Sequence, residues 1–397
     1  MAKKVMVIIG TRPEATKMGP VIRELKNHPE WFETRVVATG QHREQLDQAL
    51  AHFDIRPDVD LNLMQQNQTL AYLTSAAITA LDRVVAEERP DFILVHGDTQ
   101  TAVSGGLAAF FHKIPTGHVE AGLRSYDKTS PWPEEINRKI VDVVADYLFA
   151  PTPVCRDNLL REGFRENQIH VTGQTAVDAA AMTVRPDYRF KDDRLNDLLK
   201  RSGRTIAVTA HRREHYGQPM RRMFRAIRRV ADEHPDVSVI YPVHRSAVVR
   251  ETAQEMLGGH ERIHLLDPID YPDMIHLMQR AYLVLSDSGG LQEEATVLRK
   301  PLVLMRDTTE RPEAVAVNAV YPAGTEESRI HGITTRLLED EAFYDAMSNA
   351  ENPFGDGQAS GRIVQIIAHH FGFVPELPRP FQPERRCDGS GPDAHGG

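Results

Sequence analysis

The sequence predicts an α/β protein with two Rossmann-like, doubly wound domains that face each other across a cleft. Short apolar runs alternate with amphipathic stretches, which is typical of parallel sheets covered by helices on both faces. The alternation stops at a polar, proline-bearing stretch, residues 185–204, which we interpret as a connection, and then starts again. The chain has 397 residues, which is long for one hydrophobic core and suits two domains.

Strands in the first half are predicted from short runs of branched apolar residues, typical of strands buried in a parallel sheet. They lie at residues 5–9, 35–38, 92–95, 116–119, 147–150 and 169–171. Amphipathic stretches between them predict helices at residues 14–27, 43–53, 70–88, 101–113, 134–145 and 153–161. This alternation predicts the first domain, residues 1–172.

The second half repeats the pattern and predicts a second domain, residues 173–357. Its strands are expected at residues 205–209, 237–241, 263–266, 283–286 and 302–305, and its helices at residues 218–233, 271–280, 291–298 and 326–338. A helix at residues 358–372 is expected to complete the first domain. From residue 373 the composition changes to Pro, Gly, Arg and Asp, so residues 373–397 are expected to form a mobile tail without a role in catalysis.

Composition and charge narrow the class of protein. The formal net charge of -9 argues against a nucleic-acid or membrane-surface partner. Cys155 and Cys387 have neither metal-ligand spacing nor a disulfide framework, which favours a reducing compartment. No segment approaches transmembrane length, and the apolar run at residues 5–9 is too short for a signal peptide. We therefore expect a cytoplasmic protein.

The turn after the predicted strand 283–286 has features of a phosphate-binding site. It reads Ser-Asp-Ser-Gly-Gly at residues 286–290 and leads into a helix. Two glycines at the helix start leave backbone N–H groups uncovered, and the helix dipole adds positive potential for a diphosphate. Glu294, about one turn into the helix, is placed to accept both hydroxyls of a ribose. The alternative is a plain glycine-rich connection.

Ionisable residues also stand at other strand ends, where α/β proteins build their sites. Asp98, Glu120 and His211 follow predicted strands, and Glu134 begins a predicted helix. Three carboxylates and a histidine around one cleft indicate acid–base chemistry.

Each of these residues, and Arg12, a cation at the first strand-to-helix turn, also has a structural interpretation. Asp98 would cap the helix that begins near residue 101, Glu120 would pair with Arg124, Glu134 would complement a helix dipole, Arg12 would lie on the surface beside Pro13, and residues 211–214 would be a solvated charge run.

The sequence lacks the motifs typical of metal-binding, dinucleotide-binding and ATP-binding sites. His42, His96, His118, His211 and His244 lie on separate segments, without metal-ligand spacing. Neither a Gly-x-Gly-x-x-Gly fingerprint nor a Walker A sequence is present. Hydride transfer and ATP hydrolysis are therefore not expected.

Taken together, these motifs resemble those of the non-hydrolysing UDP-N-acetylglucosamine 2-epimerases of bacteria. The resemblance runs in unbroken order over residues 3–372. Thr296 and Arg299 depart from it, because the family commonly has proline and glycine there. The matching segments are residues 10–15, 41–43, 96–99, 118–124, 133–138, 211–214, 286–294, 306–313 and 355–359.

The resemblance implies a glycosyltransferase-B-like architecture, a homodimer, and interconversion of UDP-GlcNAc and UDP-ManNAc without cofactor or metal. The positions it matches to catalytic residues are Asp98, Glu120, Glu134 and His211. Those it matches to UDP-sugar contacts are Arg12, Lys17, His211, Ser288, Gly289, Gly290, Glu294 and Arg311.

The resemblance also implies a second site, at which many members bind UDP-GlcNAc as an activator. Gln41, Arg212 and His244 match that site. Asn67 stands where some members have an arginine.

The expected chemistry suits these residues. Carbon 2 of the sugar has no adjacent carbonyl, so its proton becomes acidic only as UDP leaves carbon 1. Fixed cations would stabilise the leaving diphosphate, and carboxylates in different protonation states would move the proton. The alternatives are a hydrolysing epimerase that releases ManNAc and UDP, a UDP-sugar-dependent glycosyltransferase, and a non-catalytic sensor.

Overall fold

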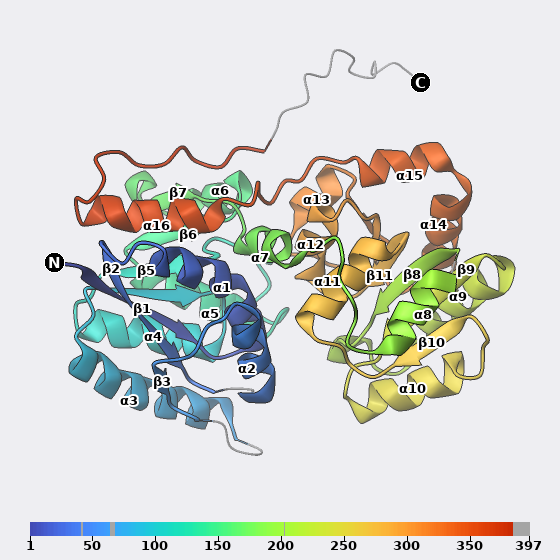
Figure 1. Cartoon of the computed structure of the whole chain (residues 1–397), viewed down its shortest axis with the longest axis horizontal. Helices are drawn as coiled ribbons and strands as arrows, with labels where there is room; N and C mark the ends of the chain where they lie inside the picture. Colours follow the sequence, from blue (N-terminus) through green and yellow to red (C-terminus); the bar gives the residue numbers. More distant parts are fainter. Residues whose placement is uncertain (41–42, 64–67, 202, 384–397) are drawn as a thin grey trace, which may run out of the picture.

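The computed structural model describes residues 1–40, 43–63, 68–201 and 203–383. Two parallel sheets lie side by side, each flanked by helices, which confirms the predicted α/β class (Figure 1). Among the described residues, none of the helices combines the length and apolar character that a membrane span requires.

The first sheet has seven strands in the order β3-β2-β1-β4-β5-β6-β7. Its order reverses between β1 and β4, the place where ligands bind in doubly wound sheets. The strands are β1 (Lys3–Ile9), β2 (Phe32–Ala38), β3 (Val59–Asp60), β4 (Phe92–His96), β5 (Thr116–Val119), β6 (Tyr147–Ala150) and β7 (Ile169–Val171).

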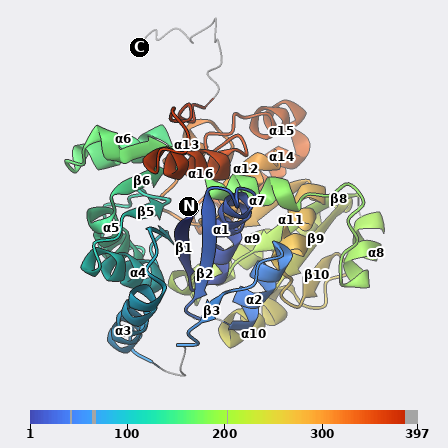
Figure 2. The ribbon, with the colours of Figure 1, turned by 60° about the vertical axis from the view of Figure 1, so that its left-hand side comes forward.

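Helices cover both faces of this sheet because side chains alternate along its strands. Val5, Val7 and Ile9 of β1 pack on one side with α1 (Arg12–Lys26), α2 (Arg43–His52) and α16 (Ala359–His370). Met6 and Ile8 pack on the other with α3 (Leu70–Glu88), α4 (Gln100–Phe111) and α5 (Glu134–Val144), as Figure 2 shows. The helix α6 (Pro153–Arg161) packs against β6 and the edge strand β7.

The second sheet has the order β10-β9-β8-β11-β12-β13 and reverses between β8 and β11. Its strands are β8 (Arg204–Thr209), β9 (Val237–Pro242), β10 (Ile263–Leu266), β11 (Leu283–Ser286), β12 (Leu302–Leu304) and β13 (Val320–Pro322). On one face lie α9 (Gln218–Glu233), α10 (Ala247–Leu257), α14 (Glu327–Glu339) and α15 (Glu341–Ser348). On the other lie α8 (Asp193–Arg201), α11 (Tyr271–Arg280), α12 (Leu291–Val297) and α13 (Pro312–Ala316).

The helix α7 (Thr175–Thr183) joins the two cores. Its Ala179 packs in the first core with Ile363 of α16, and its Val177 packs in the second core with Phe354. Because α7 packs in both, the domain limits at residues 172/173 and 357/358 stay a prediction.

All the predicted strands and helices are present, most of them within two residues of the expected ends. Residues 185–204, interpreted as a connection, contain the helix α8, which was not predicted. Its Leu195, Leu198 and Leu199 face the second core at helical spacing, but charged neighbours obscure the pattern. The short strands β3 and β13 and the helices α7, α10, α13 and α15 were not predicted.

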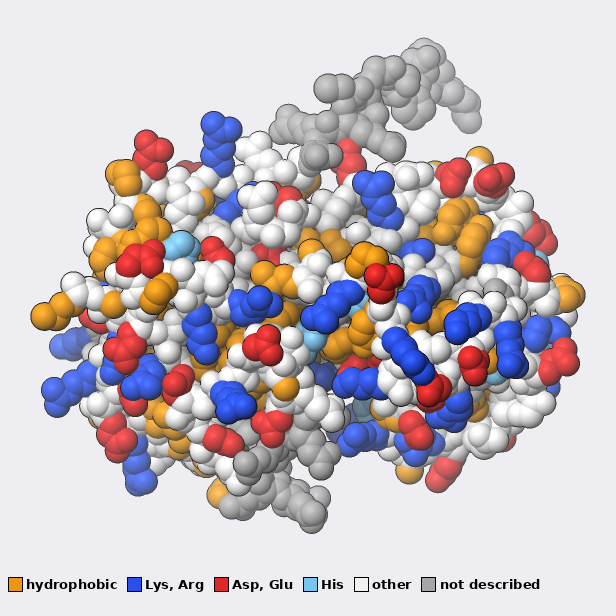
Figure 3. Space-filling view, in the orientation of Figure 1, with side chains coloured by type: hydrophobic (Ala, Val, Ile, Leu, Met, Phe, Trp, Pro, Cys, Tyr) orange, Lys and Arg blue, Asp and Glu red, His pale blue; other side chains and the backbone are white. Residues whose placement is uncertain are grey.

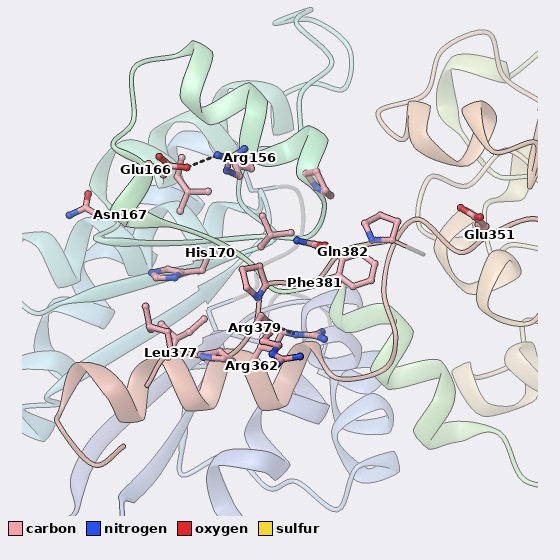
Figure 4. Close-up of a pocket in the computed structure, with 17 residues that line it drawn as sticks. Arg156, Glu166, Asn167, His170, Glu351, Arg362, Leu377, Arg379, Phe381 and Gln382 are labelled. Atoms are coloured by element: carbon pink, nitrogen blue, oxygen red, sulfur yellow. Dashed lines mark hydrogen bonds and ion pairs between the residues drawn. The ribbon is translucent and has the colours of Figure 1, made fainter. Parts of the chain in front are cut away.

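The predicted mobile tail is also corrected in part. Residues 374–383, the C-terminal strap, pack on the first domain, where they border a cavity of 1010 Å³ between α6, β7 and α16 (Figure 4). Phe381 is only 4% exposed, its N–H donates to the Val171 carbonyl at 2.8 Å, and the Arg362 guanidinium lies over its ring. The strap is polar on average, but one aromatic residue anchors it. The rest of the predicted tail, residues 384–397, lies outside the described residues.

We predict that Phe381→Ala lowers the melting temperature, because burying such a side chain contributes ~1.5–3 kcal/mol. The matched control is Leu377→Ala, a strap residue that is 48% exposed and should change little. Thermal unfolding measures both, and an unchanged melting temperature for Phe381→Ala would show that the strap contributes nothing to stability.

Candidate functional site

A cavity of 310 Å³ lies between the two domains, where the carboxyl ends of β1 and of β8 and β11 face each other. On the face shown in Figure 3, basic and histidine side chains lie along the boundary between the two halves. The predicted site residues that line the cavity are Arg12, Lys17, His211, His244, Ser288, Gly290 and Glu294. The two switch points therefore meet at one site.

On the first-domain side, a capping box places Arg12 at the start of α1. Thr11 caps the helix, and the buried Glu14 accepts from the backbone N–H groups of Gly10 and Thr11 at 3.1 and 2.7 Å. Thr99 Oγ1 donates to the other Glu14 oxygen at 2.7 Å, which joins the β1 turn to the β4 turn. Burial lowers the pKa of Arg12, so an anion in the cleft would stabilise its charge.

On the second-domain side, Asp287 holds the turns after β8 and β11 together. Its Oδ2 accepts from the backbone N–H groups of His211 and Arg212, both at 2.9 Å, and from His215 Nδ1 at 3.2 Å. Burial opposes the charge of Asp287, but His215 and His211 outweigh burial and lower its pKa. The motif contains Asp287, but sequence reasoning gave it no role.

His211 is fixed in orientation by its neighbours. Its ring stacks on His244 with centroids 5.4 Å apart, and its Nδ1 lies 3.4 Å from Asp287 Oδ1. Burial lowers the pKa of His211; Asp287 opposes this effect, but Arg212 and Arg12 add to it, so the net shift is downward. The neutral imidazole is therefore favoured.

The two glycines before α12 face different surroundings: Gly290 faces open space, and Gly289 faces buried charged side chains. A Cβ on Gly290 would meet nothing within 4 Å, so its backbone is open to the cavity. A Cβ on Gly289 would lie 2.6 Å from Glu310 Oε1 and 3.0 Å from an Arg311 nitrogen, so a side chain there would force these buried, paired side chains to shift. Gly289 and Arg311 do not line the cavity but lie directly behind it.

Glu120 is buried beneath the cavity in a network of donors. It bonds to Lys17 Nζ, and its Oε2 also accepts from Gln174 Nε2 at 2.7 Å. Burial opposes its charge, but Lys17 and His96 hold the pKa of Glu120 well below its usual range. Glu120 has φ of 74°, a left-handed conformation uncommon for residues other than glycine. The proposed alternative is wrong, because Arg124 pairs with Asp142 and Glu162 instead.

Asp98 and Glu134 lie close to each other, and neither lines the cavity. Asp98 forms an ion pair with Arg138 and does not cap α4, because Thr99 does. Glu134 begins α5, and its buried Oε2 has no hydrogen-bond partner among the described residues. Burial raises the pKa of Glu134, and the charge of Asp98 raises it further.

Glu294 and Glu293 are adjacent on α12 but differ in environment. Glu294 lines the cavity, and burial together with Glu293 raises its pKa to about 7. Glu293 is 0% exposed and accepts hydrogen bonds from Arg311 Nε at 2.5 Å and from Gln174 Nε2 at 3.0 Å, and it forms an ion pair with Lys17 Nζ at 3.1 Å. Sequence reasoning gave Glu293 and Gln174 no role, since their partners are distant in sequence.

The predicted activator residues are only partly described. Gln41 and Asn67 lie outside the described residues. His244 lines the cavity, whereas Arg212 bonds to the Asp287 carbonyl at 2.8 Å and lies behind Gly289. The activator site stays a prediction.

Comparison with known proteins agrees with this geometry. The family model described as UDP-N-acetylglucosamine 2-epimerase matches residues 23–368. The chain is 48% identical to the UDP-N-acetylglucosamine 2-epimerase of Bacillus subtilis strain 168, with 95% of this chain and 98% of that protein covered.

Solved structures are similar over the same length. A UDP-N-acetylglucosamine 2-epimerase structure from Listeria monocytogenes, there named as putative, is 46% identical, with a TM-score of 0.91, and covers 96% of this chain and 99% of its own. The UDP-GlcNAc 2-epimerase of Neisseria meningitidis, solved with UDP-GlcNAc bound, is 42% identical, with a TM-score of 0.86, and covers 92% of this chain and 100% of its own. With a family model and relatives of this identity matching nearly its full length, the chain belongs to the UDP-N-acetylglucosamine 2-epimerase family.

Proposed function

We propose that this protein is a non-hydrolysing UDP-N-acetylglucosamine 2-epimerase, which interconverts UDP-GlcNAc and UDP-ManNAc. One observation carries the proposal: a single cavity between the switch points of both sheets is lined by Arg12, Lys17, His211, Ser288, Gly290 and Glu294. The related protein from Neisseria meningitidis binds UDP-GlcNAc, which supports the same ligand here.

The diphosphate would lie between Arg12 and the turn at Ser288 and Gly290. Arg12 supplies a fixed cation, and the uncovered backbone at Gly290 admits the ligand. Charge-assisted contacts of this kind stabilise a leaving diphosphate because they need no reorganisation during the reaction. Glu294 would accept from the ribose hydroxyls.

The reaction would proceed by elimination and re-addition. The C1–O bond breaks and its electron pair leaves with the diphosphate, while the C2–H bond supplies the pair of a new C1–C2 double bond. A carboxylate takes the proton, which leaves a 2-acetamidoglucal. A proton then adds to the opposite face of carbon 2, and a diphosphate oxygen adds to carbon 1.

The carboxylates differ in the protonation state that their surroundings favour. Lys17 and His96 keep Glu120 ionised against burial, so it is suited to accept a proton, and the ion pair with Arg138 orients Asp98. Burial raises the pKa of Glu134, which suits it to donate one. A proton acceptor and a proton donor in one cleft meet the need of the reaction.

The first experiment incubates the purified protein with UDP-GlcNAc and no acceptor. An epimerase forms UDP-ManNAc, a hydrolysing relative releases ManNAc and UDP, and a sensor or an acceptor-dependent glycosyltransferase leaves the UDP-GlcNAc unchanged. In heavy water, deuterium should enter carbon 2 of the product, because the glycal must be reprotonated.

We predict that Glu120→Gln and Asp98→Asn lower turnover by about 10²–10⁴-fold while UDP affinity, measured by calorimetry, is kept. Asp178→Asn is the matched control, since Asp178 is a buried carboxylate that binds the start of α16 away from the cavity. Normal turnover in the amide variants, or product without deuterium at carbon 2, would contradict the mechanism.

We also predict that Glu294→Gln removes a pH dependence of stability. Because burial raises the pKa of Glu294 from 4.5 to about 7, the folded chain binds this proton more tightly than the unfolded chain. The stabilisation that the protonated Glu294 contributes is complete below pH 4.5 and is lost as the pH rises through about 7. Melting temperatures across this range should therefore show the variant gaining on the wild type as pH rises, whereas the exposed Glu251→Gln should show no such gain.

We further propose that the protein forms a homodimer through α4 and α5. Ile136, Ile140 and Val143 form an exposed stripe on α5, with Val143 73% exposed, and Phe110 and Phe111 are exposed at the end of α4. Apolar stripes of this kind are typical of surfaces that pack against a partner, and a two-fold axis would bury the same face of both copies.

Light scattering should give the mass of a dimer for the wild type and of a monomer for Val143→Lys. Val248→Lys, on α10 of the second sheet, is the matched control and should remain dimeric. A monomeric wild type would rule out this interface.

A further inference from the structure

A buried group of charges crosses from one domain to the other beneath the cavity. Glu120 comes from the end of β5, whereas Glu293 comes from α12 of the second sheet. Lys17 Nζ contacts both carboxylates, and so does the side-chain amide of Gln174. Two donors are therefore shared between two carboxylates of different domains.

The shared donors explain why neither carboxylate is placed independently. The Gln174 amide has two N–H groups. Its Nε2 donates one hydrogen bond to Glu120 at 2.7 Å and another to Glu293 at 3.0 Å. Gln174 itself lies where the chain crosses between the domains, with its backbone N–H 2.7 Å from the Phe354 carbonyl. Movement of one carboxylate relative to the other breaks these bonds.

Glu293 also has a partner in its own domain. Its Oε1 accepts from Arg311 Nε at 2.5 Å, and Arg311 in turn pairs with Glu310 at 2.8 Å. Arg311 lies behind Gly289, the side where the diphosphate would bind. Glu293 thus contacts both the lysine that holds Glu120 and the arginine beside the phosphate turn.

We propose that Glu293 is a positioning residue that couples the acid–base side of the cleft to its phosphate side. It divides Lys17 between two carboxylates and, by pairing with Arg311 Nε, restrains the Arg311 charge from the diphosphate. This inference rests on the proposed function. Glu293 makes no contact with the reacting atoms and acts through Lys17 and Arg311.

Removing the charge of Glu293 has opposite effects on the two sides. Lys17 would be left to Glu120 alone, which favours the ionised form and weakens Glu120 as a base. Arg311 would lose one of the two carboxylates that pair with it, so its charge would interact more strongly with the diphosphate. The charged or titratable groups that face Glu120 are Lys17, His96, Cys155, Glu293 and Arg311.

We predict that Glu293→Gln lowers kcat by about 10²-fold, the size of effect typical of misplaced catalytic groups, without raising KM. The acid limb of its kcat–pH profile should move to lower pH, because Glu120 then protonates at lower pH. Glu293→Asp keeps the charge and should restore part of kcat. Calorimetry should show UDP binding at least as tight as in the wild type.

Asp178→Asn is the control for a structural effect, because it also removes a buried carboxylate. It should lower the melting temperature and leave KM, kcat and the pH profile unchanged. If Glu293→Gln behaves like this control, or binds UDP more weakly, the inference is wrong. If the wild type forms no UDP-ManNAc, the proposed function is wrong, and the UDP titration still decides whether Glu293 restrains Arg311.

Discussion

The ion network around Lys17 is the interaction on which the geometry of the cleft depends. Lys17 lies between Glu120, which follows β5, and Glu293 of α12 in the second domain, and all three side chains are buried. A buried charge is tolerated only when it is paired, and removing one partner of a buried pair typically costs ~3–5 kcal/mol. The two domains therefore cannot separate at this point without exposing or unpairing these charges, which links their relative position to the charge state of the cleft.

The same network explains how similar side chains acquire different chemical properties. Burial acts on Glu120, Glu134 and Glu294 in the same direction, toward the neutral form. Lys17 and His96 reverse the effect at Glu120, whereas Glu134 and Glu294 have a neighbouring carboxylate that strengthens it. The number and sign of the neighbours, more than the residue type, thus set which carboxyl holds a proton near neutral pH.

Much of the fold could be predicted from the sequence because buried parallel strands are continuous apolar runs, and these runs mark β1, β4, β8 and β11. Elements of weak pattern were missed. Two- and three-residue strands such as β3 and β13 carry too few side chains for a pattern, and the charges of α8 obscured its apolar face. The C-terminal strap was misjudged because average composition does not reveal that a single residue, Phe381, is buried.

The sequence by itself determined which residues stand at the strand ends, and so which side chains meet in the cleft, because parallel strands bring their carboxyl ends to one edge. Only the tertiary structure decided what each of them contacts. Gln174 and Glu293 are 119 positions apart, and Asp287 meets His211 across 76 positions. The first contact follows from the packing of the start of α7 against α12, and the second from the pairing of β8 with β11. No local pattern encodes them, because burial and partners depend on the whole chain.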